Sequence, residues 1–147
     1  MSIEAVAHKL GGRTVLHREI TSELDLATAV REGLPSESLD HVLETVREWA
    51  GSQAAVLDIV GSRRTLERKT GGRQTSLKPS ESDRLARLAR MIVRAEQAIG
   101  DPDKAHRWLM KPNRALNGQV PFTLLDSDAG ATAVEQVLDR IEYGVIG

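Results

Sequence analysis

The residue types that most often carry catalysis or hold metals are few and scattered in this 147-residue chain. It has no cysteine, which excludes thiolate metal sites and thiol nucleophiles. Its histidines lie far apart, without a carboxylate at metal-ligand spacing: His8, His17, His41 and His106. No nucleophile elbow, phosphate-binding loop or dinucleotide motif occurs. We therefore predict that the chain is not an enzyme, that it binds no metal, cofactor or small-molecule substrate, and that its function is binding.

Acidic residues gather on one face of the last predicted helix, which we expect from Asp128 to Tyr143. With Asp128, this face holds Glu135, Asp139 and Glu142. Two carboxylates can act as general acid and base, but no histidine, cysteine or metal ligand accompanies them. The pattern favours a face that is solvated or that meets a partner.

Basic residues gather in the middle of the chain. Between residues 61 and 78 there are six basic residues and one acid, Glu67. A short helix over 53–60, a turn at Gly61 and a helix that begins after Ser62 have the sequence pattern of a helix-turn-helix. The second helix bears arginines of the kind that contact base edges and phosphates. DNA binding and a solvated basic face without a ligand are both open interpretations of this cluster.

Helical spacing of apolar residues predicts the elements that position these two clusters. We expect helices over 22–32, 35–49, 80–99 and from 102 to about 110, in addition to those already named. Predicted N-caps are Ser22 with Asp25, Ser80 with Asp83, and Asp101 before Pro102. Trp49 and Trp108 are expected in the core. The buried stripe of the last helix is predicted as Ala131, Val134, Leu138 and Ile141.

These elements predict an all-α fold in four parts. A flexible arm over 1–21, with a short strand at 14–16, precedes a helix-turn-helix region over 22–78. A connecting and dimerisation helix over 79–100 leads to a small helical domain over 101–147. The connecting helix has an arginine-rich face, which either extends a DNA contact or pairs with acids on neighbouring helices. Its arginines are Arg84, Arg87, Arg90 and Arg94.

The overall composition names no partner. Lys and Arg number 20 against 21 Asp and Glu, so the formal net charge is −1. No apolar run is long enough for a signal peptide or a membrane span. We therefore expect a soluble, cytoplasmic protein that does not bind membranes.

The C-terminal residues resemble the toxin-binding domain of the Xre, ParS and MbcA antitoxins. The family pattern has an alanine before Trp-Leu, then Pro-Asn, a turn with Leu and Gly, a Pro before Leu-Leu, a Gly, and a last helix ending in Gly-Val. The matching residues are Ala105, Trp108, Leu109, Pro112, Asn113, Leu116, Gly118, Pro121, Leu124, Leu125, Gly130, Gly144 and Val145. Residues 62–66 match the family's Xre/Cro-like helix-turn-helix segment and residues 81–90 its long helix. The resemblance covers roughly residues 22–147.

This resemblance implies the antitoxin of a type II toxin-antitoxin system. Such an antitoxin is a homodimer that inhibits a co-encoded RES-domain toxin and, with that toxin, represses its own operon at operator DNA. RES-domain toxins resemble ADP-ribosyltransferases and use NAD, so this chemistry belongs to the toxin. The residues expected to bind DNA are Arg63, Arg64, Thr65, Arg68, Lys69 and Arg73. The alternative is a stand-alone helix-turn-helix transcription regulator whose C-terminal domain dimerises or binds another partner.

The last helix and the residues after it are the expected inhibitory segment. A pocket that binds NAD presents cations to two phosphates, and an acidic helix face is complementary to its entrance. Apolar side chains beyond Gly144 are expected to enter the cleft, and Tyr143 either contacts the toxin or caps its own core. The residues expected to bind the toxin are Glu135, Asp139, Glu142, Tyr143, Val145, Ile146 and Gly147. The opposing interpretation is a frayed chain end.

Overall fold

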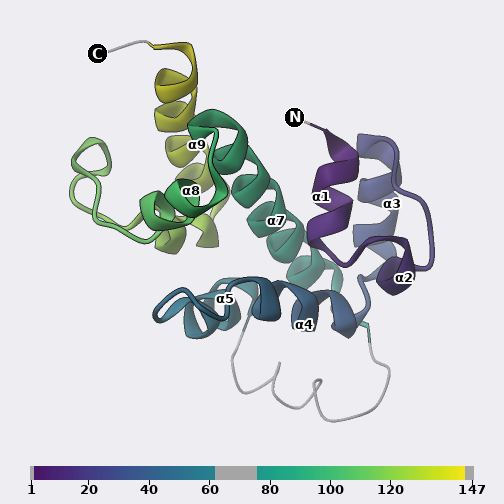
Figure 1. Cartoon of the computed structure of the whole chain (residues 1–147). Helices are drawn as coiled ribbons and strands as arrows, with labels where there is room; N and C mark the ends of the chain where they lie inside the picture. The colour runs from purple at the N-terminus through teal and green to yellow at the C-terminus, as the bar shows by residue number, and fades with distance from the viewer. Residues whose placement is uncertain (1, 62–75, 145–147) are drawn as a thin grey trace.

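The computed structural model describes residues 2–61 and 76–144 and shows an all-α chain (Figure 1), as predicted. No strand occurs among these residues, and no helix among them is long and apolar enough to cross a membrane. The α-helices are α1 (Ile3–Lys9), α2 (Gly12–Leu16), α3 (Glu23–Glu32), α4 (Ser36–Thr45), α5 (Ser52–Val60), α7 (Pro79–Ile99), α8 (Pro102–Leu109) and α9 (Asp128–Tyr143). Two short 3-10 helices, η1 (Arg114–Leu116) and η2 (Pro121–Asp126), connect α8 to α9.

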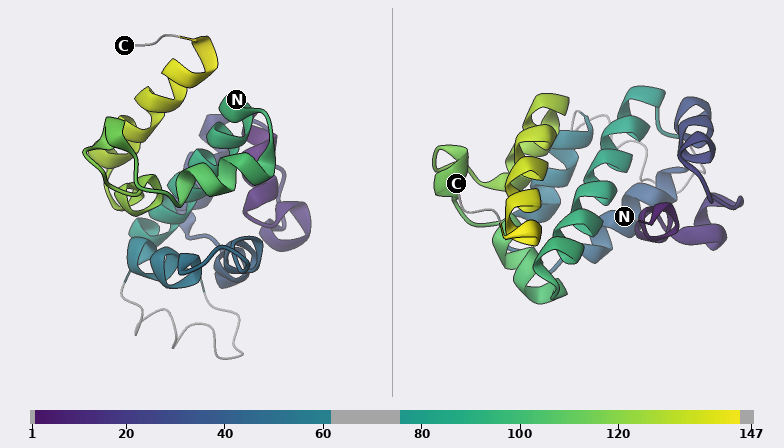
Figure 2. Two further views of the ribbon diagram at one scale, coloured as in Figure 1. Left: turned by 60° about the vertical axis from the view of Figure 1, so that its left-hand side comes forward. Right: turned by 90° about the horizontal axis from the view of Figure 1, so that it is seen from above.

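Helix α7 is the central element of the fold. It packs against α1, α3 and α5 of the N-terminal half and against α8, α9 and η2 of the C-terminal half. Leu85, Leu88 and Ala89 are fully buried along it, and the buried residues of both halves form one continuous core. Figure 2 shows α7 and α9 side by side from above. The two halves therefore share α7 instead of being joined by an exposed linker.

The prediction of a flexible arm with a short strand is wrong for residues 2–21. Most of these residues form α1 and α2, and Ser2 caps α1 by accepting a hydrogen bond from the Ala5 amide. Val6 and Leu10 are fully buried in the common core. Each helix is too short to show a clear period of its own, and its burial depends on α7 and α4, which the local sequence does not reveal.

The helix starts follow the capping residues with one exception. The Ser22 hydroxyl accepts from the Asp25 amide at 3.1 Å at the start of α3, and Asp101 precedes Pro102 at the start of α8. Helix α7 begins at Pro79 instead of Ser80, because Glu81 and not Asp83 accepts a hydrogen bond, at 2.7 Å, from the Lys78 amide. Proline fits the first position of a helix, where its missing N–H is not needed.

Two apolar predictions need correction. Helix α4 ends at Thr45, so Trp49 lies in the turn before α5, and both Trp49 and Trp108 are half-buried against the core instead of inside it. In α9, whose predicted bounds are confirmed, Val137 is buried and Ile141 is exposed. Ile141 follows the spacing of the buried stripe but is exposed, because the C-terminal end of α9 extends beyond the neighbouring helices (Figure 1).

Candidate functional site

The sequence-predicted binding residues divide into two groups. The six proposed DNA-binding residues lie between 62 and 75, outside the described residues. Three proposed toxin-binding residues, Val145, Ile146 and Gly147, also lie outside the described residues. The other four, Glu135, Asp139, Glu142 and Tyr143, all lie on α9. The described residues also contain no group of three or more His, Asp or Glu placed to hold a metal ion.

The arginine row of α7 makes contacts to both halves of the chain. Arg84 donates a hydrogen bond to the Val60 carbonyl at 3.3 Å, which satisfies the end of α5 next to the predicted helix-turn-helix turn. Arg87 lies 3.3 Å from Asp128 at the start of α9. Of the two interpretations of this row, pairing with neighbouring helices is confirmed.

Arg90 pairs with α3. Its guanidinium donates two hydrogen bonds of 2.6 Å to the two carboxylate oxygens of Glu23. These hydrogen bonds hold the pKa of Glu23 below its ordinary value and the pKa of Arg90 above its own. The bidentate geometry fixes α3, the first helix of the helix-turn-helix region, against α7.

Arg94 pairs with α9. Its side chain is 9% exposed, and its guanidinium lies 2.6 Å from an oxygen of Asp139 and 2.6 Å from an oxygen of Glu142. Burial by itself lowers the pKa of Arg94, but its hydrogen bonds to the two carboxylates raise the pKa above its ordinary value. Two of the acids that the sequence assigned to a partner are therefore already paired inside the chain.

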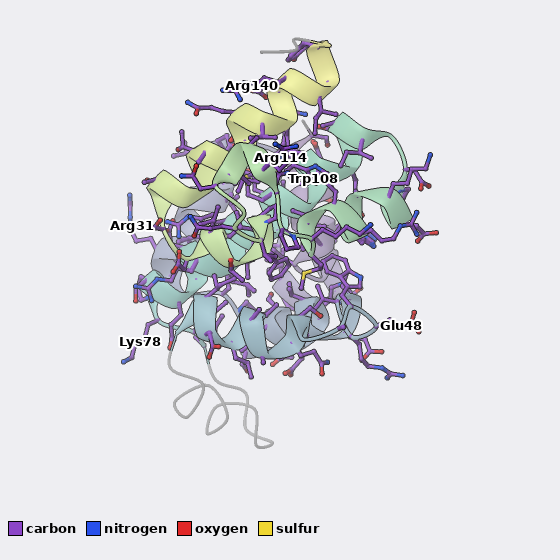
Figure 3. The ribbon with its side chains drawn as sticks, turned by 90° about the vertical axis from the view of Figure 1, so that its left-hand side faces the viewer. Arg31, Glu48, Lys78, Trp108, Arg114 and Arg140 are labelled. Atoms are coloured by element: carbon purple, nitrogen blue, oxygen red, sulfur yellow. The ribbon has the colours of Figure 1, made fainter. Side chains whose placement is uncertain are left out.

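The C-terminal end of α9 exposes large apolar side chains. Ile141 is 42% exposed and Tyr143 is 72% exposed, and α9 ends at Gly144 in a left-handed conformation. Figure 3 shows this end, where Arg140 is labelled, extending past the ends of the other helices. Tyr143 does not cap its own core. Sequence reasoning missed the exposure of Ile141, because only the length of the neighbouring helices determines where the packing stops.

Gly130 sets the start of α9. A Cβ at this position would lie 1.9 Å from the Leu124 carbonyl oxygen, so only glycine allows η2 to approach this closely. The Gly130 amide also donates to the Ser127 hydroxyl at 3.0 Å, which caps the helix. The turn before η2 is similarly ordered, because Asn113 accepts from the Gly118 amide at 2.8 Å and Leu116 is buried.

A polar cluster near the C-terminal end of α7 joins this helix to α8 and α1. The Glu96 carboxylate lies 2.9 Å from Nε2 of His106 on α8 and 3.1 Å from Nζ of Lys9 on α1. The His106 ring stacks on Trp49 with its centroid 4.1 Å away. The sequence analysis found no partner for His106, because Glu96 and Trp49 lie on two other segments of the chain.

Two family models match the chain. Residues 25–90 match the antitoxin Xre-like helix-turn-helix domain, and residues 94–144 match the antitoxin Xre/MbcA/ParS C-terminal toxin-binding domain. A relative named Antitoxin Xre from Photorhabdus laumondii is 31% identical over 124 residues, which cover 82% of this chain and 80% of that protein. The chain belongs to the Xre family of antitoxins.

Two more relatives share the name Antitoxin Xre. One from Yersinia enterocolitica is 32% identical over 135 residues, covering 88% of this chain and 89% of that protein. One from Pseudomonas putida is 30% identical over 126 residues, covering 86% and 76%. Neither matching model describes a catalytic domain. This antitoxin therefore combines a helix-turn-helix domain with a toxin-binding domain.

The boundary between the two matched domains lies within α7. Residues 25–90 include most of α3, all of α4 and α5, and the first part of α7, whereas residues 94–144 include the end of α7 together with α8 and α9. Arg90 and Arg94 thus stand on either side of the boundary, one facing α3 and the other facing α9. Helix α9 of the matched toxin-binding domain is therefore paired directly with α7, which also packs against the helices of the helix-turn-helix domain.

Proposed function

We propose that this antitoxin binds and inhibits a co-encoded RES-domain toxin by blocking its NAD-binding pocket. We further propose that it forms a homodimer and, with the toxin, represses its own operon in the cytoplasm. In this proposal the chain contributes binding surfaces only, and the chemistry on NAD belongs to the toxin. Residues 22–78 read the operator, residues 79–100 connect and dimerise, and residues 101–147 hold the toxin.

The observation that carries the inhibitory part is the exposed end of α9. Within residues 2–61 and 76–144, the exposed large apolar side chains are Leu24, Ile141 and Tyr143, and two of the three lie in the last turn of α9. That turn belongs to the matched toxin-binding domain, and only Gly144 separates it from residues 145–147. Exposed apolar and aromatic side chains on a projecting helix end are suited to filling a partner's cleft.

The electrostatic part of the proposal involves fewer acidic residues than the sequence indicated. Asp139 and Glu142 already pair with Arg94, so they offer little free negative charge to a cationic pocket entrance. Glu135 lies in an exposed position on α9, but it is close enough to Arg90 for its negative charge to help raise the pKa of Arg90. We therefore assign the direct toxin contacts to Ile141, Tyr143 and residues 145–147, with a minor contribution from Glu135.

Removal of the terminal residues tests this mechanism. The variants are a deletion of residues 145–147 and Tyr143→Ala, with Arg140→Ala as a control in the same exposed turn. We expect the deletion and Tyr143→Ala to restore NAD consumption by the toxin in a purified mixture, whereas Arg140→Ala still inhibits. Full inhibition by the deletion variant would refute blocking of the pocket by the tail.

The repressor part is tested by operator binding. Changing Arg63, Arg64 and Arg68 together to Ala is expected to weaken binding to operator DNA while toxin inhibition stays intact. Binding of the unaltered protein should also weaken steeply with added salt, because protein cations displace counterions from the phosphates. Unchanged operator affinity in the triple variant would refute the assignment of these residues.

A further inference from the structure

Packing stops early along α9. Val134 and Leu138 are fully buried, but no residue from Asp139 to Gly144 is buried. The last turn nevertheless lies against the body of the protein through the two ion pairs of Arg94, which reach Asp139 and Glu142 one helical turn apart. Among the described residues, these pairs are the polar contacts between the end of α9 and α7.

The position of these acids is unfavourable for the helix itself. The C-terminal end of a helix carries a partial negative charge, so a carboxylate such as Glu142 in the last turn is destabilising unless a cation compensates it. Arg94 provides that cation from a buried site, and its own charge there requires a carboxylate partner. The Arg94 guanidinium and the two carboxylates thus require each other, which indicates that the carboxylates serve the fold and are not left open for a ligand.

We propose that Arg94 is the positioning residue for toxin recognition, and that Asp139 and Glu142 are its internal counterions instead of toxin contacts. Arg94 fixes the direction in which the end of α9 leaves the body, and so presents Ile141 and Tyr143 to the toxin in one orientation. A helix end that is ordered before binding loses less conformational entropy on binding. This inference rests on the proposed function and names the residue that organises its binding surface.

A double-mutant cycle on toxin affinity tests the proposal. The variants of the full-length antitoxin are Arg94→Met, the pair Asp139→Asn with Glu142→Gln, and all three changes together. Arg140→Met is the matched control, because Arg140 is exposed on the same turn and has no ion pair within the described residues. Affinity for the purified co-encoded toxin is measured by calorimetry, and amide hydrogen exchange of α9 is followed in the free antitoxin.

We expect Arg94→Met and the amide pair each to weaken toxin binding at least tenfold, and the triple variant to be no weaker than Arg94→Met alone. Amide exchange at residues 139–143 should accelerate in these variants while exchange in the buried part of α7 stays unchanged. Arg140→Met should leave both measurements near the wild-type values. The amide pair is the second variant because neither acid is buried and both replacements keep the side-chain size; thermal unfolding of every variant checks that the fold is retained.

Two results would overturn the proposal. If Arg94→Met binds the toxin as tightly as the wild type while the amide pair binds weakly, the carboxylates contact the toxin directly. If the losses multiply in the triple variant, Arg94 and the acids act independently. Should the wild-type antitoxin bind no RES-domain toxin, the proposed function fails, but the hydrogen-exchange comparison still decides whether Arg94 orders the end of α9.

Discussion

Replacement of Gly130 by alanine separates two opposite expectations about the toxin-binding domain. Gly130 lies in the first turn of α9, where alanine is the better helix former by about 1 kcal/mol. Helix propensity by itself therefore predicts a more stable protein. The structure predicts the opposite, because the new Cβ would lie 1.9 Å from the Leu124 carbonyl oxygen, where the neighbour is backbone and cannot rotate away.

The size of the loss follows from what must move. Relief of the overlap requires α9 and η2 to separate by roughly 1 Å or more, and forced overpacking of this kind costs about 1–3 kcal/mol. The same shift weakens the cap between Ser127 and the Gly130 amide, which contributes about 1 kcal/mol. After the gain in propensity, we expect a net loss of about 2 kcal/mol, or a fall in Tm of about 4–8 °C.

Urea and thermal unfolding of Gly130→Ala measure this loss, with Thr132→Ala as the control. Thr132 is exposed on the same helix, so its replacement should leave stability unchanged or raise it slightly. Toxin affinity should fall in parallel for Gly130→Ala, since η2 and the start of α9 set the position of the whole helix. A Gly130→Ala protein as stable as the wild type would refute the reasoning from the close approach.

Two further predictions concern the contacts between α7 and the N-terminal half. Ser82→Ala removes the hydroxyl that accepts from the buried Leu34 amide at 2.8 Å, so we expect a loss of about 1–3 kcal/mol in urea unfolding, against no change for the exposed Ser80→Ala. Glu23→Gln should cost about 0.5–1 kcal/mol at pH 7, because the exposed pair with Arg90 is lost. Hydrogen bonds from Arg90 hold the pKa of Glu23 below its ordinary value, so this contribution is present above about pH 4.3 and is lost as the pH falls through the lowered pKa. The stability difference between wild type and Glu23→Gln should therefore shrink in acid; a difference that stays constant down to pH 2 would contradict the assignment.

The predictions that succeeded are those that depend on neighbours in the chain. The bounds of α9, the cap of α3 at Ser22 and the start of α8 at Asp101 and Pro102 were all confirmed. Each follows from interactions over three or four residues, which the sequence displays directly. The short sequence motifs from Ala105 to Gly144, in their order and spacing, also sufficed to identify the toxin-binding domain, which the family match confirms.

The predictions that failed depend on segments far apart in the chain. Helices α1 and α2 are buried because α7 and α4 offer apolar surfaces, and Ile141 is exposed because α9 extends beyond its neighbours. Most of all, the sequence predicted an acidic face for a partner, and the fold placed buried Arg94 against two of its acids. Charge along a helix is local information, but which charge lies opposite is decided by packing between elements that are 45 residues apart, as Arg94 and Asp139 are.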